Sequence, residues 1–572
     1  MQATKIYEVN TIKNLKDMIE QSTNLYGTKN AFYVKPLDGH DYKGITYNEF
    51  KKDLDAFGTA LLNLGLKDKF IAVIGENRYE WCVTYLSTVN GVGVIVPLDK
   101  ELPPLELQNL LNRSNASAIV YSGKHHDTIK DISGKVTSLK YFINMDANEH
   151  TDNEYLSLKK LISEGKDQIV KGNVDYINAK VDENTMNFLI FTSRTTDLAK
   201  GVMLSHKNIC TDIMSVTSAI YIDSNDSVLS ILPLHHTYAC TVDFLTLAYR
   251  GGCISFNEGL KHIAKNLKET RPTLLILVPL IIENMYQKIW LQASKDKKLK
   301  LKLRLGLFIS NFFYNVLKID LRKKLFKQVL DNLGGRVRII IAGAAAIEPT
   351  VSKGLRNMGI STLQGYGLTE ASPIVAVNRE EMNRDDSIGL PIPGVEVKIV
   401  NPDKDGIGEL IVKGGNVMLG YYQNEAASQK VLRDGWLYTG DLGRIDSQGF
   451  IYITGRLKNV IVTKNGKNVF PEEVESYINK SPYIKESLVT GKDTDENGET
   501  MVTAQIVIDL DAIKEKLNTD TPSHEEIYKL IKSEIKQANH NMPLYKRVQD
   551  FTIREAEFAK TTTKKIKRYL EK

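Results

Sequence analysis

The segment 188–206, FLIFTSRTTDLAKGVMLSH, carries the pattern that decides the fold class of this chain. The apolar run Phe188–Phe191 predicts a buried strand, and 207–220 predicts a helix. Between them, 192–201 (TSRTTDLAKG) holds four hydroxyl side chains and one lysine. A polar loop between a strand and a helix favours an α/β fold and marks the place to look for a ligand.

The loop at 192–201 has the chemistry needed to bind phosphates. Hydroxyl and backbone N–H groups donate to phosphate oxygens, a lysine adds charge, and a following helix would add the positive end of its dipole. It is not a Walker A loop, because Gly-Lys-Ser and Gly-Lys-Thr occur nowhere in the chain. The phosphate-binding candidates are Thr192, Ser193, Thr195, Thr196 and Lys200.

Outside this segment, short strand-like runs alternate with amphipathic helical stretches. The runs at 70–74, 118–121 and 338–341 are short and rich in β-branched residues, whereas 47–64 and 105–112 have helical periodicity. The alternation predicts an α/β fold with largely parallel sheets.

The pattern changes twice toward the C-terminus. From 387 to 453, short strands separated by glycine-rich turns predict a small β-rich subdomain. After Gly455, strands and helices restart over a length that suits a small α+β domain. We therefore expect a large N-terminal region at 1–455, a connection at 456–459 and a C-terminal domain at 460–572.

The composition is that of an ordinary globular protein. The chain has 572 residues, 42% hydrophobic and 25% charged, which is enough for more than one domain. A net charge of +6 is too dilute to indicate a nucleic-acid partner. The four cysteines form no CxxC pair, and the first residues lack the apolar core of a signal peptide, so we expect a cytoplasmic protein.

Basic and apolar residues alternate at 295–304, before the apolar stretch 305–314. This pattern predicts a solvated helix face. The alternative is a patch that contacts a membrane surface peripherally, such as the inner face of the cell membrane. No apolar run has the roughly 20 residues needed to cross a bilayer.

Two further segments have side chains suited to a nucleotide base and a metal ion. Ala342-Gly343-Ala344-Ala345 follows a strand-like run, and its small residues let a planar base approach the backbone. In 364–370, QGYGLTE, Tyr366 can stack on a base and Glu370 offers a hard carboxylate oxygen to Mg²⁺.

Three more segments complete the pattern near the C-terminus. Asp441, in YTGDLG at 438–443, can accept hydrogen bonds on both carboxylate oxygens, as two ribose hydroxyls require. GRLKN at 455–459 lies at the expected domain connection, and KTTTKKIKR at 560–568 is rich in lysine.

In this order, the six segments resemble the signature of the adenylate-forming (AMP-binding) superfamily, which includes acyl-CoA synthetases, luciferases and the adenylation domains of peptide synthetases. The stretch 266–286, with Arg271-Pro272-Thr273 and Val278-Pro279, resembles the branch of long-chain fatty acid–CoA ligases. The resemblance covers nearly the whole chain, from the Ile45-Thr46-Tyr47 segment to the terminal lysine motif.

The resemblance implies a reaction in two steps. A carboxylic acid, specifically a medium- or long-chain fatty acid, would react with ATP and Mg²⁺ to give acyl-AMP and pyrophosphate, and coenzyme A would then take the acyl group. Transfer to the thiol of an acyl carrier protein is the alternative. Rotation of the C-terminal domain about the hinge would separate the steps. The oligomeric state stays open.

The resemblance also assigns roles to residues. Lys565 takes the catalytic position, where its ammonium would stabilise charge on the carboxylate and the α-phosphate. Thr369 and Glu370 face the α-phosphate and the metal, Thr192 is the other metal ligand, and His236, after His235, lies beside the acyl channel. The implied ATP-binding residues are Thr192, Ser193, Thr195, Thr196, Lys200, Gly343, Ala344, Ala345, Gly365, Tyr366, Gly367, Thr369, Asp441 and Arg456, and the hinge residues are Lys458 and Asn459.

The chain departs from the family pattern at the phosphate loop and the lysine motif. Arg194, Asp197 and Ala199 replace the usual glycine, glycine and proline, and Lys564 replaces the glycine before Lys565. A side chain where glycine provides a positive φ costs on the order of 1–2 kcal/mol. A weakly active or non-catalytic homologue that binds nucleotide and acyl chain is therefore a further alternative.

Overall fold

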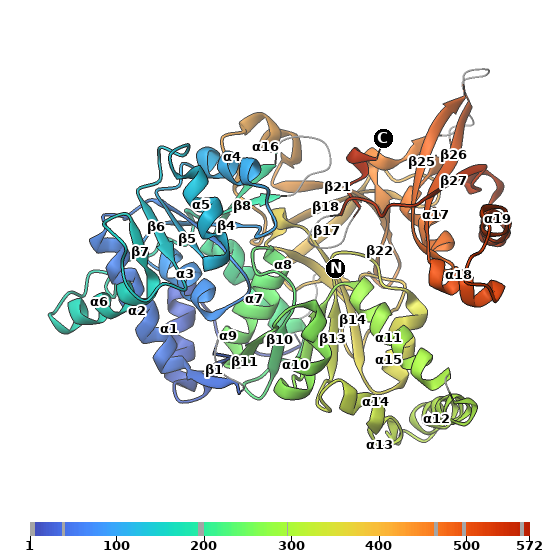
Figure 1. The fold of residues 1–572 in the computed structure, drawn as a ribbon, viewed down its shortest axis with the longest axis horizontal. Coiled ribbons are helices and arrows are strands. Elements are labelled where there is room, and N and C mark those ends of the chain that lie inside the picture. The colour runs from blue at the N-terminus through green and yellow to red at the C-terminus, as the bar shows by residue number, and fades with distance from the viewer. Residues whose placement is uncertain are drawn as a thin grey trace. The chain divides into compact units, whose positions relative to one another are not determined.

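A computed structural model describes residues 6–36, 41–192, 199–294, 296–462, 467–494, 499–560 and 566–571. The chain divides into two compact units. Unit 1 contains the described residues up to Glu396 together with Val412–Leu437. Unit 2 contains Val397–Ile411 and the described residues from Tyr438 onward. Figure 1 shows the C-terminal helices and strands of unit 2 in orange to red.

The first sheet of unit 1 has eight strands in the order β19-β9-β8-β4-β3-β5-β6-β7. Its central strands pair in parallel and are almost completely buried, in agreement with their uninterrupted apolar sequences. β8 and β9 form an antiparallel hairpin, and β19 pairs with β9. The bounds are β3 Phe70–Ile74, β4 Val94–Leu98, β5 Ala118–Tyr121, β6 Tyr141–Asn144, β7 Tyr155–Ser157, β8 Met186–Thr192, β9 Lys200–Ser205 and β19 Gly420–Tyr421.

Helices pack around this sheet (Figure 1). α2 begins with a capping box, in which the Thr46 and Glu49 side chains each accept a hydrogen bond from the other residue's backbone. α4 and α5 contribute Leu111 and Ile129 to a core that contains Ile119 of β5. The bounds are α1 Leu15–Tyr26, α2 Tyr47–Asn63, α3 Tyr79–Val89, α4 Pro104–Ser114, α5 His126–Ser133, α6 Leu158–Val170 and α7 His206–Ala219.

The second sheet of unit 1 has nine strands in the order β16-β15-β14-β13-β12-β10-β11-β1-β2. Neighbouring strands from β14 through β1 pair in parallel, and antiparallel strands close both edges. The strand bounds are β1 Asn30–Val34, β2 Lys43–Thr46, β10 Ser227–Ser230, β11 Cys253–Phe256, β12 Leu274–Leu277, β13 Ile339–Ala342, β14 Ser361–Gly367, β15 Ile374–Val377 and β16 Leu390–Pro391. The associated helices are α8 Thr237–Ala239, α9 Thr246–Arg250, α10 Ile263–Thr270, α11 Pro279–Ser294, α12 Lys297–Val316, α13 Arg322–Leu325, α14 Lys327–Asn332 and α15 Pro349–Asn357.

The rest of the chain forms smaller sheets. A five-stranded sheet has the order β17-β18-β21-β20, with β22 paired to β21, and three-stranded β25-β26-β27 contains a parallel pair, β26 and β27. Val474 of α17 and Ile531 of α19 belong to the same core as Ile506 of β26. The bounds are β17 Val395–Val400, β18 Gly408–Gly414, α16 Glu425–Val431, β20 Leu432–Arg433, β21 Trp436–Ile445, β22 Ile451–Arg456, β23 Ile461–Val462, β24 Asn468–Val469, α17 Pro471–Ile478, β25 Ile484–Thr494, β26 Glu499–Ile508, α18 Leu510–Leu517, α19 His524–His540 and β27 Asp550–Arg554.

The predicted α/β class with largely parallel sheets is confirmed, but two details differ. A short strand, β9, stands where the sequence predicted the end of a loop. Within 387–453, β16 and β19 belong to the two large sheets of unit 1, so this range is not a single subdomain. Among the described residues, no helix combines the length and hydrophobicity that crossing a bilayer requires.

Candidate active site

The β8–β9 hairpin holds the two ends of the predicted phosphate loop. Thr192 and Lys200 are cross-strand partners, and Thr192 Oγ1 donates to the Lys200 carbonyl oxygen over 3.3 Å. The other predicted phosphate contacts, Ser193, Thr195 and Thr196, lie outside the described residues. The same is true of two substituted positions, Arg194 and Asp197.

The prediction that the dipole of the following helix favours a phosphate at this loop is wrong. α7 begins after its N-cap, Ser205, and Ser205 pairs with Met186 at the opposite end of the hairpin from Thr192. β9 has six residues and therefore separates the loop from the helix start by about 20 Å. The positive end of α7 is too far away to favour a phosphate at the loop, because the dipole acts within about one turn.

Lys200 and Glu370 come together through a residue that no sequence motif indicated. Lys200 Nζ lies 4.7 Å from the ring centroid of Tyr421, and Tyr421 Oη donates to Glu370 Oε1 over 2.8 Å. Tyr421 is on β19, which pairs with β9 beside Val202. The Glu370 side chain is buried, so its carboxylate has a fixed orientation at the hairpin. Tyr421 is 51 positions from Glu370, and local spacing therefore gives no signal for the contact.

The QGYGLTE segment turns sharply after β14. A Cβ at Gly367 would lie 1.9 Å from the Pro373 carbonyl oxygen, so only glycine fits there. The short 3₁₀ helix Thr369–Ala371 follows. Thr369 Oγ1 lies 3.4 Å from Thr237 Oγ1, which places Thr369 beside the segment that carries His236.

The predicted adenine wall follows β13 and packs against an aromatic side chain. A Cβ at Gly343 would lie 2.6 Å from the Tyr238 ring, and Tyr238 Oη donates to the Ile341 carbonyl oxygen over 3.2 Å. Ala344 has a φ of +72°, in the left-handed region that favours glycine. Gly343, Ala344 and Ala345 therefore form a tight turn at the carboxyl end of β13, where ligands bind in open α/β sheets.

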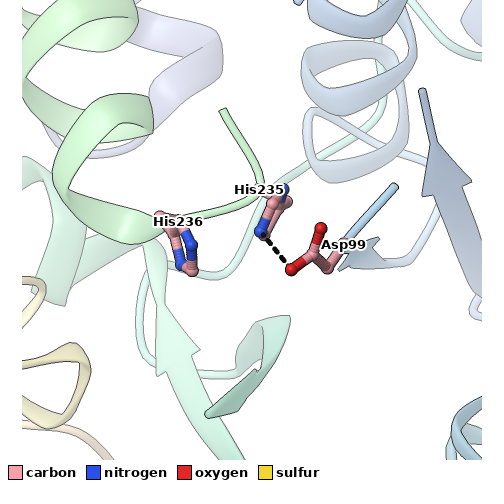
Figure 2. A group of neighbouring side chains, drawn as sticks. All are labelled: Asp99, His235 and His236. Atoms are coloured by element: carbon pink, nitrogen blue, oxygen red, sulfur yellow. Dashed lines mark ion pairs between the residues drawn. The ribbon is translucent and has the colours of Figure 1, made fainter. Parts of the chain in front are cut away.

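Asp99, His235 and His236 form a polar cluster in unit 1. Figure 2 shows the His235 ring directed toward the Asp99 carboxylate, with Nε2 3.4 Å from Oδ2. The two imidazole centroids are 4.1 Å apart, and each residue has a potential ligand atom within 4.8 Å of the others. Imidazole and carboxylate groups suit a divalent transition metal. However, Asp99 and His236 have other interactions as well, so the cluster alone does not indicate an ion.

His235 also lines a narrow, mostly apolar cavity. Its other walls include Tyr85 of α3, Ile190 of β8, Leu204 of β9 and Leu234. The sequence predicted His236 beside an acyl channel but did not indicate Asp99, whose position directly after β4 could have suggested a ligand-facing carboxylate.

In unit 2, two predicted ribose-binding residues lie together. Asp441 of β21 and Arg456 of β22 are cross-strand partners, and Arg456 Nε lies 2.8 Å from Asp441 Oδ1. The Asp441 side chain is 5% exposed and the Arg456 side chain is 49% exposed, so the carboxylate is fixed by a partner that still reaches solvent. Thr439 Oγ1 accepts from Asp441 N over 3.0 Å, which shapes the turn before the carboxylate.

The predicted hinge residues form a 3₁₀ turn, Leu457–Asn459, after β22. Asn459 Nδ2 donates to Glu472 Oε1 over 2.6 Å, and Glu472 is in the first turn of α17. The contact ties Asn459 to the body of unit 2. Lys458 lies in the middle of the same turn.

The C-terminal lysine segment is anchored on both sides. Lys560 Nζ lies 2.8 Å from Glu486 Oε2, and Arg568 pairs with the buried Glu475. Lys560 and Ile566 form an isolated antiparallel bridge. Lys564 and Lys565, which follow the first anchor, lie outside the described residues.

Comparisons with known proteins identify the family of the chain. Residues 19–422 match the AMP-binding enzyme family, and residues 458–570 match the AMP-binding enzyme C-terminal domain. The chain is 29% identical over 473 residues to long-chain-fatty-acid–CoA ligase 6 of Mus musculus, covering 77% of this chain and 67% of that protein. It is 25% identical over 569 residues to long-chain-fatty-acid–CoA ligase FadD15 of Mycobacterium bovis, covering 94% and 92%.

Solved structures share the fold. ATP-bound MatB from Rhodopseudomonas palustris matches with a TM-score of 0.74 and 22% identity, covering 98% of each chain. The anthranilate CoA ligase AuaEII with anthranoyl-AMP matches with a TM-score of 0.75 and 19% identity, covering 100% of this chain and 97% of that chain. With the two family matches, the class is that of adenylate-forming α/β enzymes. The chain belongs to the AMP-binding enzyme family, which confirms the resemblance seen in its motifs.

Proposed function

We propose that this protein activates a medium- or long-chain fatty acid with ATP, through an acyl-AMP intermediate, and transfers the acyl group to coenzyme A. The observation that carries the proposal is a linked group of four residues. Lys200 Nζ lies 4.7 Å from the Tyr421 ring centroid, and Tyr421 Oη donates to Glu370 Oε1 over 2.8 Å. Thr369 directly precedes Glu370 in the chain. A cation, a buried carboxylate and a hydroxyl beside one hairpin suit a polyphosphate and its metal ion.

The proposed chemistry of the first step follows from the positions of these groups. The Lys200 ammonium would balance phosphate charge, while Tyr421 keeps the Glu370 carboxylate oriented through its hydrogen bond. Glu370, with Thr192, offers the hard oxygen ligands that Mg²⁺ prefers, and the bound ion would neutralise charge on the phosphates. Asp441 would accept the ribose hydroxyls and Arg456 would contact the ribose or a phosphate.

Relatives support the acyl substrate and the acceptor. Both sequence relatives described above are named as long-chain fatty acid–CoA ligases. Structural relatives also include an anthranilate CoA ligase, so the choice of a fatty acid rests on the sequence relatives. His236 would lie beside the acyl group. The other substrates would be cytoplasmic ATP and coenzyme A, with Mg²⁺ as the metal ion.

The test is ATP–pyrophosphate exchange driven by short, medium and long acids, followed by detection of the thioester. We expect exchange with medium or long fatty acids and product with coenzyme A. Exchange without product, or product only with an acyl carrier protein, would favour an acyl-AMP ligase. No exchange despite ATP binding would favour a non-catalytic homologue.

Single substitutions test the proposed roles. Glu370→Gln should lower the exchange rate roughly 10²- to 10³-fold, because a carboxylate beside the phosphates is lost. Tyr421→Phe should lower it about tenfold, because Glu370 remains but loses its orienting partner. A Tyr421→Phe effect equal to that of Glu370→Gln would contradict this division of roles.

The catalytic role of Lys565 and the rotation about Lys458 and Asn459 are part of the proposal. Lys565→Ala should abolish exchange but leave thioester formation from supplied acyl-AMP, because the lysine would act in the first step. Lys564→Ala is the matched control, with the same change of charge one position earlier. Equal effects of the two substitutions would refute the assignment of Lys565.

Reduced activity is a second candidate outcome, because Arg194 and Asp197 replace the usual glycines of the phosphate loop. If Arg194 and Asp197 impair an intact site, restoring glycine at both positions should raise the exchange rate. An unchanged rate would show that these two side chains do not limit catalysis.

A further inference from the structure

α12 carries an apolar stripe on the side opposite its buried side. Leu303 is packed into a core with Ala293, Phe326 and Met358, and Ser310 Oγ donates to the Asn357 carbonyl oxygen over 3.4 Å. With 3.6 residues per turn, positions 301, 305, 308, 312 and 316 lie about 180° around the helix from 303 and 310. We name this side the α12 outer face; it consists of Leu301, Leu305, Phe308, Phe312 and Val316.

The α12 outer face is exposed to solvent along its whole length. The exposed fractions of Leu301, Leu305, Phe308, Phe312 and Val316 are 67%, 55%, 71%, 49% and 62%. Single exposed apolar residues are common, but five aligned on one side of one helix form a continuous strip of about 22 Å. Beyond the helix end, Leu317 and Ile319 are also exposed, at 48% and 47%.

Basic side chains flank this strip. At 100° per residue, Lys297 and Arg304 lie on one flank of the outer face, and Lys298 and Lys302 lie on the other. All four residues are exposed, and within the described part of the chain none of them forms an ion pair. They therefore present a positive border to whatever covers the strip.

The segment around α12 carries a high positive charge. Residues 297–327 contain ten basic residues and one acid, a net charge of +9, whereas the whole chain has +6. The single acid, Asp320, is paired with Arg322 at 2.7 Å, and the Arg322 guanidinium lies 3.8 Å from the Tyr314 ring centroid. These contacts fix the turn after α12 and leave the lysine charge uncompensated nearby.

We infer that the α12 outer face docks onto the surface of a membrane that contains anionic lipids. An exposed apolar strip flanked by lysine and arginine is the pattern of a helix that lies in the lipid interface. A second copy of this chain is a poor occupant, because two such regions would repel each other. α12 is too polar to cross the bilayer, in agreement with the absence of a spanning helix among the described residues.

Docking would give the site access to a membrane-dissolved substrate. This consequence rests on the proposed fatty-acid activity, whereas docking itself does not. A fatty acid partitions into the bilayer, and a protein held at that surface meets it at a higher local concentration. α12 would then act as a positioning element for the whole enzyme.

Vesicle sedimentation of the full chain tests the inference. We expect wild-type protein to bind phosphatidylglycerol-containing vesicles, with weak binding to phosphatidylcholine alone and a decrease at high salt. The triple variant Leu305→Gln, Phe308→Gln, Phe312→Gln should bind roughly a hundredfold more weakly, because the apolar contact is lost. The triple variant Lys298→Gln, Lys302→Gln, Arg304→Gln should bind equally to both vesicle types.

A matched control replaces exposed apolar residues elsewhere. Val170, Leu260 and Leu544 are 87%, 61% and 77% exposed, and their change to glutamine should leave vesicle binding and the unfolding temperature unaltered. Wild-type binding by the α12 apolar variant would overturn the inference. So would binding to an acidic protein but not to vesicles, or a dimer that dissociates in this variant.

The readouts separate docking from the proposed function. Sedimentation needs neither ATP nor a fatty acid. Vesicle binding in a protein without exchange activity would refute the function and support docking. Exchange activity without vesicle binding would support the proposed function and refute docking.

Discussion

Candidate site residues are held in different ways in the two units. In unit 1, Gly343 and Gly367 sit where a Cβ would meet a ring at 2.6 Å or a carbonyl oxygen at 1.9 Å, so close packing of the main chain sets the geometry. In unit 2, Asp441 and Glu475 are held by Arg456 and Arg568, whose side chains are 49% and 21% exposed. Close packing is independent of salt and pH, whereas ion pairs are not. The turns at Gly343 and Gly367 should therefore keep their geometry when salt or pH changes but should not tolerate substitution, whereas the contacts of Asp441 and Glu475 should depend on salt and pH.

The largest effect expected from this difference is at Gly367. Gly367→Ala places a Cβ against the main chain of Pro373, which has no rotamer to adopt, so unit 1 should lose more than about 3 kcal/mol of stability. All three tryptophans, Trp81, Trp290 and Trp436, belong to unit 1, so urea unfolding followed by tryptophan fluorescence reports it directly. A loss below about 1 kcal/mol would show that this turn is not held by packing.

A buried histidine makes unit 1 sensitive to acid but not to base. His206 Nδ1 accepts from Leu15 N over 3.1 Å and Nε2 lies 2.9 Å from the Val89 carbonyl oxygen, so both nitrogens are used by the neutral ring. Burial lowers the pKa of His206 to about 4. The pKa of His206 is lower in the folded state than in the unfolded state, where it is near 6.5. The neutral ring therefore contributes fully to stability above pH 6.5, and this contribution is lost as the pH falls through about 4.

The expected loss for this histidine is on the order of 3 kcal/mol, because each pKa unit corresponds to about 1.4 kcal/mol. Tryptophan-detected unfolding between neutral and acidic pH measures it. His206→Gln should weaken the pH dependence in that window, whereas an unchanged profile would contradict the assignment. His262, outside this core, is the matched control for a histidine substitution.

In unit 1, the sequence predicted individual buried strands better than the contacts between segments that are distant in the chain. The runs at 70–74 and 118–121 were recognisable because they are apolar throughout, and they are β3 and β5. β9 was not, because its six residues follow a polar loop and its partner β19 is distant in the chain. Tyr421 was missed for the same reason, because a tertiary contact without a local signature brings it to Glu370. Asp99 was missed although its position directly after β4 is a local signal.

Unit 2 should respond to pH in the opposite direction. Burial is the main cause that raises the pKa of Glu475 to about 7, against the lowering effect of Arg568. The folded pKa is above the unfolded value, so this carboxyl contributes stability below about pH 4.5 that is lost as the pH rises through about 7. Arg568→Gln removes the compensating charge and should cost unit 2 about 2 kcal/mol above neutral pH, and less below pH 6, where Glu475 takes up a proton.

Calorimetry is the suitable measurement for Arg568→Gln, because unit 2 has no tryptophan. The matched control is Arg554→Gln, which removes an arginine paired with Glu571, a carboxyl whose pKa is lowered. The control should show no added loss on going from pH 6 to pH 8. An equal pH dependence in both variants would show that Glu475 is not the titrating group.

The smallest expected effect concerns a glycine of unit 2 that, unlike Gly367, has room around it. Gly440, directly before Asp441, has a φ of +70° and no atom within 4 Å of an added Cβ among the described residues. Gly440→Ala therefore costs only the backbone strain of a left-handed residue, about 1 kcal/mol, and Gly440→Asn should cost less because asparagine tolerates this conformation. Calorimetry of both variants beside Gly367→Ala tests the comparison directly. A cost for Gly440→Ala as large as that for Gly367→Ala would mean that both units are limited by packing, since strain alone cannot destabilise a turn to that extent.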